Sequence, residues 1–158
     1  MMRARSTVRA LALASAAWLG LAATAQAPAP AVDALVSGAR LHLDLAELAA
    51  REPLASDEDF RVRELARDAH TSHHLVWIRK AEAPHRHDQH DLFVVILRGY
   101  GTMLLENETR PVGEGSILYV PRGTPHAFTN QSGAPAVAYA IYSPPFDGKD
   151  RVAPDAPR

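Results

Sequence analysis

The chain has 158 residues, of which 47% are hydrophobic and 22% are charged. This length and composition are typical of a single globular domain, and they exclude a disordered chain and a polytopic membrane protein. Seventeen basic residues stand against 18 acidic ones, so no excess of positive charge points to a nucleic acid or an anionic lipid as partner. The sequence has no cysteine, which excludes disulfides, thiolate metal sites and cysteine nucleophiles.

The first 25 residues have the three-part pattern of a secretory signal peptide. Three arginines lie within the first nine residues, and residues 11–23 follow as an uncharged stretch. Ala23 and Ala25 then form the small-x-small pattern that signal peptidase recognises. The uncharged stretch is shorter than the roughly 20 residues of a membrane-spanning helix, so no stable membrane span is expected. The pattern predicts cleavage after Ala25 and export to the periplasm or the medium.

The exported chain is expected to consist of a leader, one β domain and a tail. Residues 26–40 are rich in alanine and proline, which predicts a flexible leader. The domain is expected to span residues 41–145, with its core in residues 60–145, and residues 146–158 are expected to form a C-terminal tail that is frayed over residues 151–158.

The start of the domain has two interpretations that the sequence does not separate. Apolar and polar residues alternate over 41–45, which is typical of a short strand. Asp44 followed by Glu47 is equally typical of the capped start of a helix that runs through Ala50.

From residue 60 onward, short strand-like runs alternate with turns. The runs are rich in β-branched and aromatic residues, and no stretch after residue 51 has a sustained helical period. The pattern predicts an all-β fold, a single-domain antiparallel β-barrel, because closing the sheet protects its edges. The expected strands are residues 60–65, 74–80, 92–98, 102–106, 116–120, 127–129 and 136–142.

Two histidines separated by one residue, His85 and His87, precede the apolar run 92–97. On an extended chain, residues i and i+2 point to the same face, so the two imidazoles are expected to converge as two ligands of one metal ion do. The same spacing also fits a solvated polar loop that carries histidines by chance.

A second element covers residues 115–130 and consists of a strand, a Pro-Gly turn and a strand that opens with a histidine. Its marked positions are Gly115, Pro121, Gly123, His126 and Asn130. Together with His85, His87 and Gly99, this spacing resembles the two motifs of the cupin superfamily, in its small single-domain form. The resemblance covers about residues 60–145.

The resemblance implies a jelly-roll barrel in which the two motifs face each other, so that His85, His87 and His126 meet around a divalent transition metal. It also implies a fourth ligand, a carboxylate four or five positions after the second histidine. Counting forward from His87 leads to Asp91, whereas counting back from Gly99 leads to a leucine. The two counts differ by one residue, which a β-bulge near Asp91 would reconcile.

Asp91 is expected as the fourth ligand, because a carboxylate offsets part of the ion's charge that neutral imidazoles leave uncompensated. Two alternatives stay open: His90 takes its place and gives four imidazoles, or three histidines bind the metal together with waters. Three histidines and one carboxylate leave open positions on a six-coordinate ion, which suits Fe, Mn, Ni or Co, and Zn with fewer ligands. His73, His74, His70 and His42 are not expected to bind the metal.

Three functions fit these observations. The first is an exported metalloenzyme acting on a small oxygen-bearing organic molecule by dioxygenation or isomerisation. The second is a non-catalytic cupin module that binds or senses a small metabolite or a metal, and the third is a structural domain without metal. Export and the lack of an appended DNA-binding helix pair argue against a regulator that binds nucleic acid. The expected partner is a small-molecule ligand, and the resemblance further implies a homodimer.

The lining of the barrel is expected to be largely apolar. Both parities of residues 92–97 are apolar, so that strand is expected to be buried on both faces. The aromatic residues that either border a pocket or belong to the core are Trp77, Tyr119, Phe128 and Tyr139. The candidate anchors for an anionic substrate are Arg79, Arg98 and Arg122, each of which could equally be a solvated surface arginine.

Overall fold

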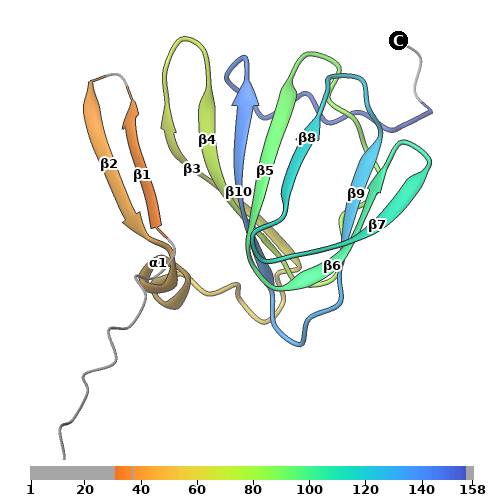
Figure 1. Cartoon of the computed structure of the whole chain (residues 1–158), viewed down its shortest axis with the longest axis horizontal. Coiled ribbons are helices and arrows are strands. Elements are labelled where there is room, and N and C mark those ends of the chain that lie inside the picture. The colour runs from red at the N-terminus through yellow and green to blue at the C-terminus, as the bar shows by residue number, and fades with distance from the viewer. Residues whose placement is uncertain (1–30, 37, 156–158) are drawn as a thin grey trace, which may run out of the picture.

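The structure is a computed structural model that describes residues 31–36 and 38–155 and is built mainly from antiparallel strands (Figure 1). The predicted signal peptide, residues 1–25, lies outside the described residues. The elements are β1 (Ala31–Val36), β2 (Ala39–Asp44), α1 (Leu45–Arg51), β3 (Phe60–Arg67), β4 (Ser72–Ile78), β5 (Asp91–Arg98), β6 (Tyr100–Leu105), β7 (Glu108–Gly113), β8 (Ile117–Val120), β9 (His126–Asn130) and β10 (Ala136–Ser143). Among the described residues, no helix is both long enough and apolar enough to cross a membrane.

Two sheets form the walls of the barrel. One has five strands in the order β3-β4-β10-β5-β8, and the other has three in the order β7-β6-β9. Figure 1 shows the two sheets facing each other, with the hairpin β1–β2 standing beside β3 and β4. Every pairing between these strands is antiparallel, which confirms the predicted all-β antiparallel barrel.

The seven predicted strands are present, and within residues 60–145 the sequence missed one further strand, β7. This strand contains Pro111 and pairs with β6 alone, at the edge of its sheet. An edge strand tolerates a proline because one of its sides has no ladder hydrogen bonds to lose. The strand was not predicted because it contains proline and charged residues, whereas the prediction relied on alternating runs of β-branched residues.

The core of the barrel lies between the two sheets. Val76 and Ile78 of β4 meet Met103 of β6 and Phe128 of β9 there, and all four are at most 7% exposed. Burying side chains of this size contributes about 1.5–3 kcal/mol each relative to exposure, so this cluster is a main source of the fold's stability.

A second apolar cluster lies on the outer face of the five-stranded sheet. Leu75 and Trp77 of β4 point outward and are covered by Val32 of β1 and Leu48 of α1. Residues 31–36, which the sequence assigned to a flexible leader, therefore form a strand because they bury this outer face. Both interpretations of the following segment hold in succession, since β2 ends at Asp44 and the Asp44 carboxylate then caps α1 by accepting the Glu47 backbone N–H at 2.8 Å.

The strand buried on both faces is β4, and the prediction of this property for residues 92–97 is wrong. Leu92 and Ile96 of β5 are buried, but Phe93, which has the opposite parity, is 39% exposed. The β1–β2 hairpin and α1 supply the outer cover of Leu75 and Trp77 in β4, and this cover leaves Phe93 exposed. An apolar run alone does not reveal which strand receives that cover.

Gly101 marks the closest approach between two strands. A Cβ atom at this position would lie 2.0 Å from the carbonyl oxygen of Thr129 in β9. We expect Gly101→Ala to lower the free energy of unfolding by about 3 kcal/mol, because backbone must move to relieve the overlap. Urea denaturation measures this loss. Gly133→Ala is the matched control, since its Cβ would meet nothing within 4 Å; equal stability of the two variants would contradict the expectation.

Candidate metal centre

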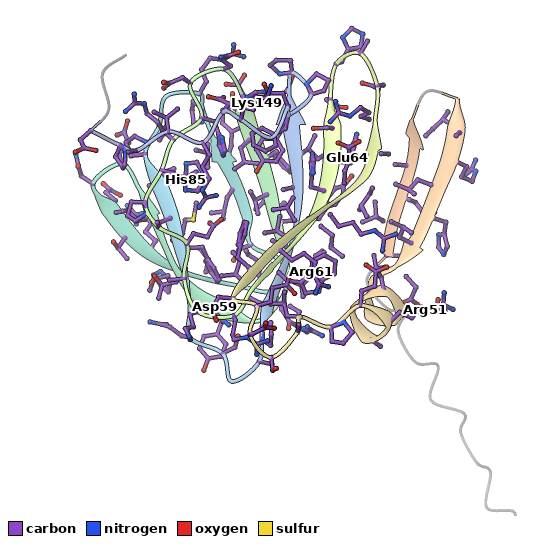
Figure 2. The ribbon with its side chains drawn as sticks, turned by 180° about the vertical axis from the view of Figure 1, so that it is seen from behind. Arg51, Asp59, Arg61, Glu64, His85 and Lys149 are labelled. Carbon is purple, nitrogen blue, oxygen red and sulfur yellow. The ribbon has the colours of Figure 1, made fainter. Side chains whose placement is uncertain are left out.

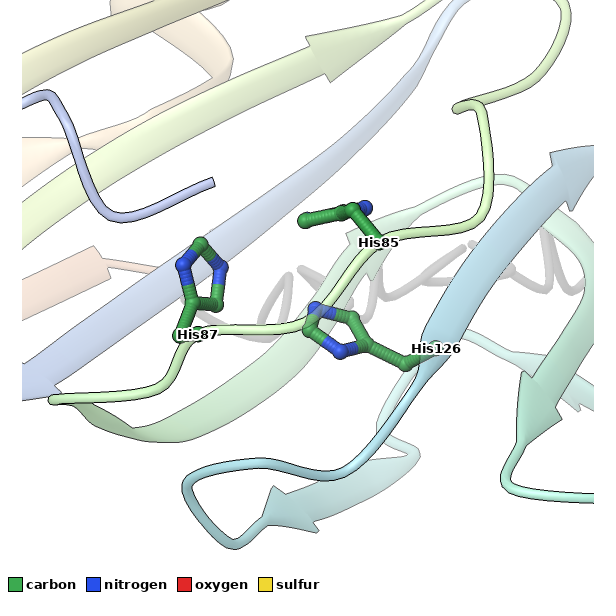
Figure 3. A group of neighbouring side chains, drawn as sticks. All are labelled: His85, His87 and His126. Atoms are coloured by element: carbon green, nitrogen blue, oxygen red, sulfur yellow. The ribbon is translucent and has the colours of Figure 1, made fainter. Parts of the chain in front are cut away.

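Three histidines from two segments meet inside one end of the barrel. His85 and His126 pair as an isolated antiparallel bridge, with N···O distances of 3.0 and 2.8 Å in the two directions. His87 follows two residues after His85 and points to the same side, as the spacing predicted (Figure 3). His85 lies in the half of the barrel that also carries Lys149, while Asp59 and Arg61 lie near the opposite end (Figure 2).

The local sequence explains how His126 reaches this position. Pro121 opens a tight turn in which the Thr124 backbone N–H donates to the Pro121 carbonyl at 3.1 Å. Gly123 within that turn has φ +77°, a left-handed conformation that glycine adopts without steric cost. The chain therefore reverses between β8 and β9, and His126 becomes the first residue of β9.

The three rings are close enough to share one ion. One ligand nitrogen from each residue lies within 4.8 Å of the other two, and each histidine is at most 4% exposed. Two nitrogens bound to a single ion are at most about 4.2 Å apart, because each metal–nitrogen bond is about 2.1 Å. Small ring movements would therefore close the cluster on an ion.

Hydrogen bonds fix which nitrogen of each ring is free. His85 Nδ1 lies 3.0 Å from the Ala83 carbonyl oxygen, and His126 Nδ1 lies 3.0 Å from that of Thr124. His87 Nδ1 lies against the Asp150 carbonyl oxygen. A carbonyl oxygen only accepts, so each Nδ1 carries the proton and donates, which leaves the Nε2 lone pair of each neutral ring available. Histidines that bind metals are oriented in the same way.

The environment keeps the three rings neutral. Burial lowers the pKa of His85 to about 3 and that of His126 to about 4, with help in each case from neighbouring positive groups. Burial also lowers the pKa of His87. At neutral pH the cluster therefore loses no proton when it binds a metal. His87 Nε2 is buried and has no hydrogen-bond partner. A buried polar atom without a partner destabilises the fold unless a bound ligand interacts with it.

These shifts predict that the metal-free protein loses stability in mild acid. The unfolded chain protonates its histidines below about pH 6.5, whereas the folded pKa values of His85, His126 and His74 are about 3 to 4. Stability should fall as the pH drops through this window, by up to about 1.4 kcal/mol per pH unit for each histidine. Urea denaturation with a chelator at about pH 7.5, 6.5 and 5.5 measures the slope, and equal stability at all three would contradict the assignment.

The expected fourth ligand, Asp91, lies outside this group. Its carboxylate accepts the Arg122 backbone N–H at 2.9 Å and the Arg122 guanidinium at 2.8 Å. These hydrogen bonds hold the pKa of Asp91 below its usual range. The carboxylate thus joins β5 to the turn after β8 as a structural contact.

The alternative ligand, His90, is also engaged elsewhere. Its Nδ1 lies 2.6 Å from the Asp150 carboxylate, and its Nε2 lies 3.3 Å from the Pro145 carbonyl oxygen. Both ring nitrogens therefore face these oxygen atoms and not the three-histidine cluster. Among the described residues, the group that could hold a metal consists of His85, His87 and His126.

Comparisons with known proteins agree with this geometry. A family model described as a cupin domain matches residues 73–142. An uncharacterized protein of Aquifex aeolicus is 38% identical over 109 residues, which cover 69% of this chain and 88% of that protein. The chain belongs to the cupin superfamily. A second relative, from Methanocaldococcus jannaschii, is 33% identical over 66 residues, 42% of this cupin and 53% of the relative.

Solved structures share the fold. The protein TT1209 from Thermus thermophilus aligns with a TM-score of 0.56 at 23% identity, covering 66% of this cupin and 97% of that chain. KdgF from Halomonas sp. aligns with a TM-score of 0.55 at 20% identity, covering 62% and 91%. At these identities the likeness establishes the jelly-roll fold and leaves the activity to be argued from the site.

The C-terminal segment of this cupin, residues 144–155, lies against the histidine cluster, and its residues 152–154 are hydrogen-bonded to Arg86 and not frayed as the sequence predicted. Val152 pairs with Arg86 through two backbone hydrogen bonds of 2.9 Å. The Asp150 carboxylate accepts the backbone N–H groups of Asp88 at 2.9 Å and Gln89 at 2.8 Å. Burial alone would raise the pKa of Asp150, but its hydrogen bonds, above all the one from His90, hold it below the usual range.

The other histidines and aromatic residues singled out in the sequence have structural partners. His73 bonds to the Tyr139 hydroxyl at 2.6 Å, and buried His74 bonds to Ser72 at 2.8 Å. Trp77 belongs to the outer cluster and Tyr119 is exposed, so Phe128 alone of the four aromatic candidates lines the interior cavity.

The three candidate arginine anchors also lie away from the centre. Arg79 donates to the carbonyl oxygens of residues 55 and 58, Arg98 to that of Pro135, and Arg122 to the Asp91 carboxylate. The arginine that faces the centre is Arg151, from the segment expected to be a frayed tail. The sequence around it, rich in proline and charge, carries no local signal for this position.

Proposed function

We propose that this cupin binds one divalent transition metal through the Nε2 atoms of His85, His87 and His126. The observation that carries the proposal is the orientation of the three rings, each of which donates its Nδ1–H to a backbone carbonyl. The buried, unpartnered Nε2 of His87 supports it, because an ion would satisfy that atom. Fe, Mn, Ni, Co and Zn all fit a set of imidazole ligands.

We further propose that the protein is an enzyme acting on a small oxygen-bearing molecule, by a dioxygenase-like or isomerase-like reaction. When bound, the metal would supply a Lewis acid that polarises an oxygen of the ligand. The three histidines would occupy one side of the ion, and His87 lines an open groove of about 480 Å³. An open groove beside the site favours an enzyme over a module that merely sequesters a metal.

Elemental analysis of protein purified from its own compartment tests metal binding. We expect about one divalent ion per chain and its loss on chelation. Screening the loaded protein with small diols, enols and hydroxy acids, for O₂ uptake and for isomerised products, then separates an enzyme from a binding module. A bound metal with no turnover of any compound would favour the non-catalytic alternative.

We also propose that the mature protein is exported after removal of residues 1–25. The charged start, the short apolar stretch and the small residues at 23 and 25 support this proposal. We expect intact-mass measurement on secreted or periplasmic protein to give an N-terminus at Gln26. Recovery of the chain with residues 1–25 still attached would contradict it.

A further inference from the structure

Two hollow spaces border the three histidines. An inner cavity of about 50 Å³ lies between the sheets and is lined by His85, His126 and Glu82 together with apolar side chains. The outer groove is lined by His87 and Arg151, among others. Phe60 and Tyr142 border both spaces. A ligand in the outer groove therefore lies beside both Arg151 and His87.

Arg151 is held in this position by its neighbours in the chain. Val152 pairs with Arg86, and the Asp150 carboxylate is bonded to the loop that contains Asp88. The Arg151 backbone N–H also donates to the Lys149 carbonyl at 2.9 Å, a γ-turn centred on Asp150, so the backbone is fixed on both sides of Arg151. Its guanidinium lies 5.4 Å from the centre of the Phe60 ring.

Arg151 is paired there with a buried acid. Its guanidinium lies 3.5 Å from the Glu82 carboxylate, whose side chain is 12% exposed. Burial raises the pKa of Glu82, and Arg151 lowers it in part. Arg151 lies beside the cluster, since it lines the same groove as His87, and its charge lowers the pKa of each of the three histidines.

The net positive charge of this arrangement favours binding of an anion beside Arg151 and the histidines. A divalent ion on three neutral imidazoles, together with Arg151, would bring three positive charges to a partly enclosed space, of which Glu82 offsets one at most, and only when it is ionised. Buried charge is costly unless it is paired. A carboxylate is a suitable anion, because it can accept two parallel hydrogen bonds from the planar guanidinium of Arg151.

Resting on the proposed function, we infer that the ligand is a small 2-hydroxy or 2-oxo carboxylic acid. Arg151 exchanges Glu82 for the ligand's carboxylate, and the adjacent oxygen faces the metal-binding histidines. The inner cavity accepts a short apolar tail, because 50 Å³ holds about three to five water-sized groups and its walls include Met103 and Phe128.

Calorimetric titration of the nickel-loaded protein with lactate and with its neutral analogue lactamide tests this inference. We expect lactate to bind at least about tenfold more tightly than lactamide, and Arg151→Gln to remove that preference. Glu82→Gln should strengthen lactate binding severalfold, because Arg151 then has no competing partner. Lys149→Gln, which removes an exposed cation from the same segment, is the matched control and should change nothing.

The opposite effects of the two variants separate ligand binding from a structural role, which would weaken binding in both. If each variant holds one nickel ion and lactate shows no preference over lactamide, the inference is wrong and the metal site stands. If inorganic phosphate binds as tightly as lactate, Arg151 is a general anion site and the carboxylate assignment is wrong. A wild-type protein that holds no nickel overturns both proposals.

Discussion

His126→Ala should lower the affinity of the protein for Ni²⁺ or Zn²⁺ by at least about 100-fold, since loss of a supporting hydrogen bond alone costs 10–100-fold. The same loss is expected for His85→Ala and His87→Ala, because each ring would supply a direct bond from its Nε2. Competition titration against a chromophoric chelator measures the affinity. Circular dichroism of each metal-free variant shows whether the barrel is retained.

Three control variants define the limits of the site. His42→Ala should leave the metal affinity unchanged, because His42 is exposed and paired with Asp33 at 2.7 Å. Asp91→Asn and His90→Gln should retain the metal within a few-fold, since the structure engages both side chains elsewhere. A loss of about 100-fold in metal affinity in Asp91→Asn would indicate that the Asp91 carboxylate binds the metal, and it would contradict the three-histidine assignment.

Arg86→Met should release the C-terminal segment and destabilise the protein by about 1.5–3 kcal/mol, because methionine cannot replace the hydrogen bonds of the buried guanidinium. Arg86 is 2% exposed and bonds to the Asp88 carboxylate at 2.7 Å. It also bonds to the carbonyl oxygens of Ala153 at 2.9 Å and Pro154 at 2.6 Å. Urea denaturation measures the loss of stability, and hydrogen exchange measures the loss of protection in residues 146–155.

Release of that segment should also weaken the metal site. His87 Nδ1 donates to the Asp150 carbonyl, so freeing Asp150 removes the contact that orients the ring, at a cost of about 10–100-fold in metal affinity. Arg110→Met is the matched control, because Arg110 is exposed and pairs only with Glu108 among the contacts described. Unchanged protection and unchanged metal affinity in Arg86→Met would show that the segment is held by other contacts.

The barrel and the histidine cluster could be predicted because each depends on short-range patterns. Alternating runs and Pro-Gly turns define the strands, and the i, i+2 spacing of His85 and His87 places both rings on one side. The spacing from Gly115 to Asn130 resembles a known motif closely enough to bring His126 opposite them.

What the sequence missed depends on contacts between distant segments. Asp91 has the right chemistry and nearly the right spacing for a ligand, but Arg122, 31 residues away, holds its carboxylate. Arg151 and Asp150 lie in a segment without a strand pattern, and contacts with Arg86, the loop after it and Glu82 hold them over the barrel. Partners separated by 60 residues or more leave no local trace in a single sequence.

A crystal structure of the nickel-loaded protein, with anomalous scattering recorded at the nickel edge, tests the central claim most directly. The account predicts one strong anomalous peak inside the barrel, about 2.1 Å from the Nε2 atoms of His85, His87 and His126. It also predicts that Asp91 still pairs with Arg122 in that crystal. Absence of a peak among these three nitrogens, or a peak bound instead by Asp91 or His90, would contradict it.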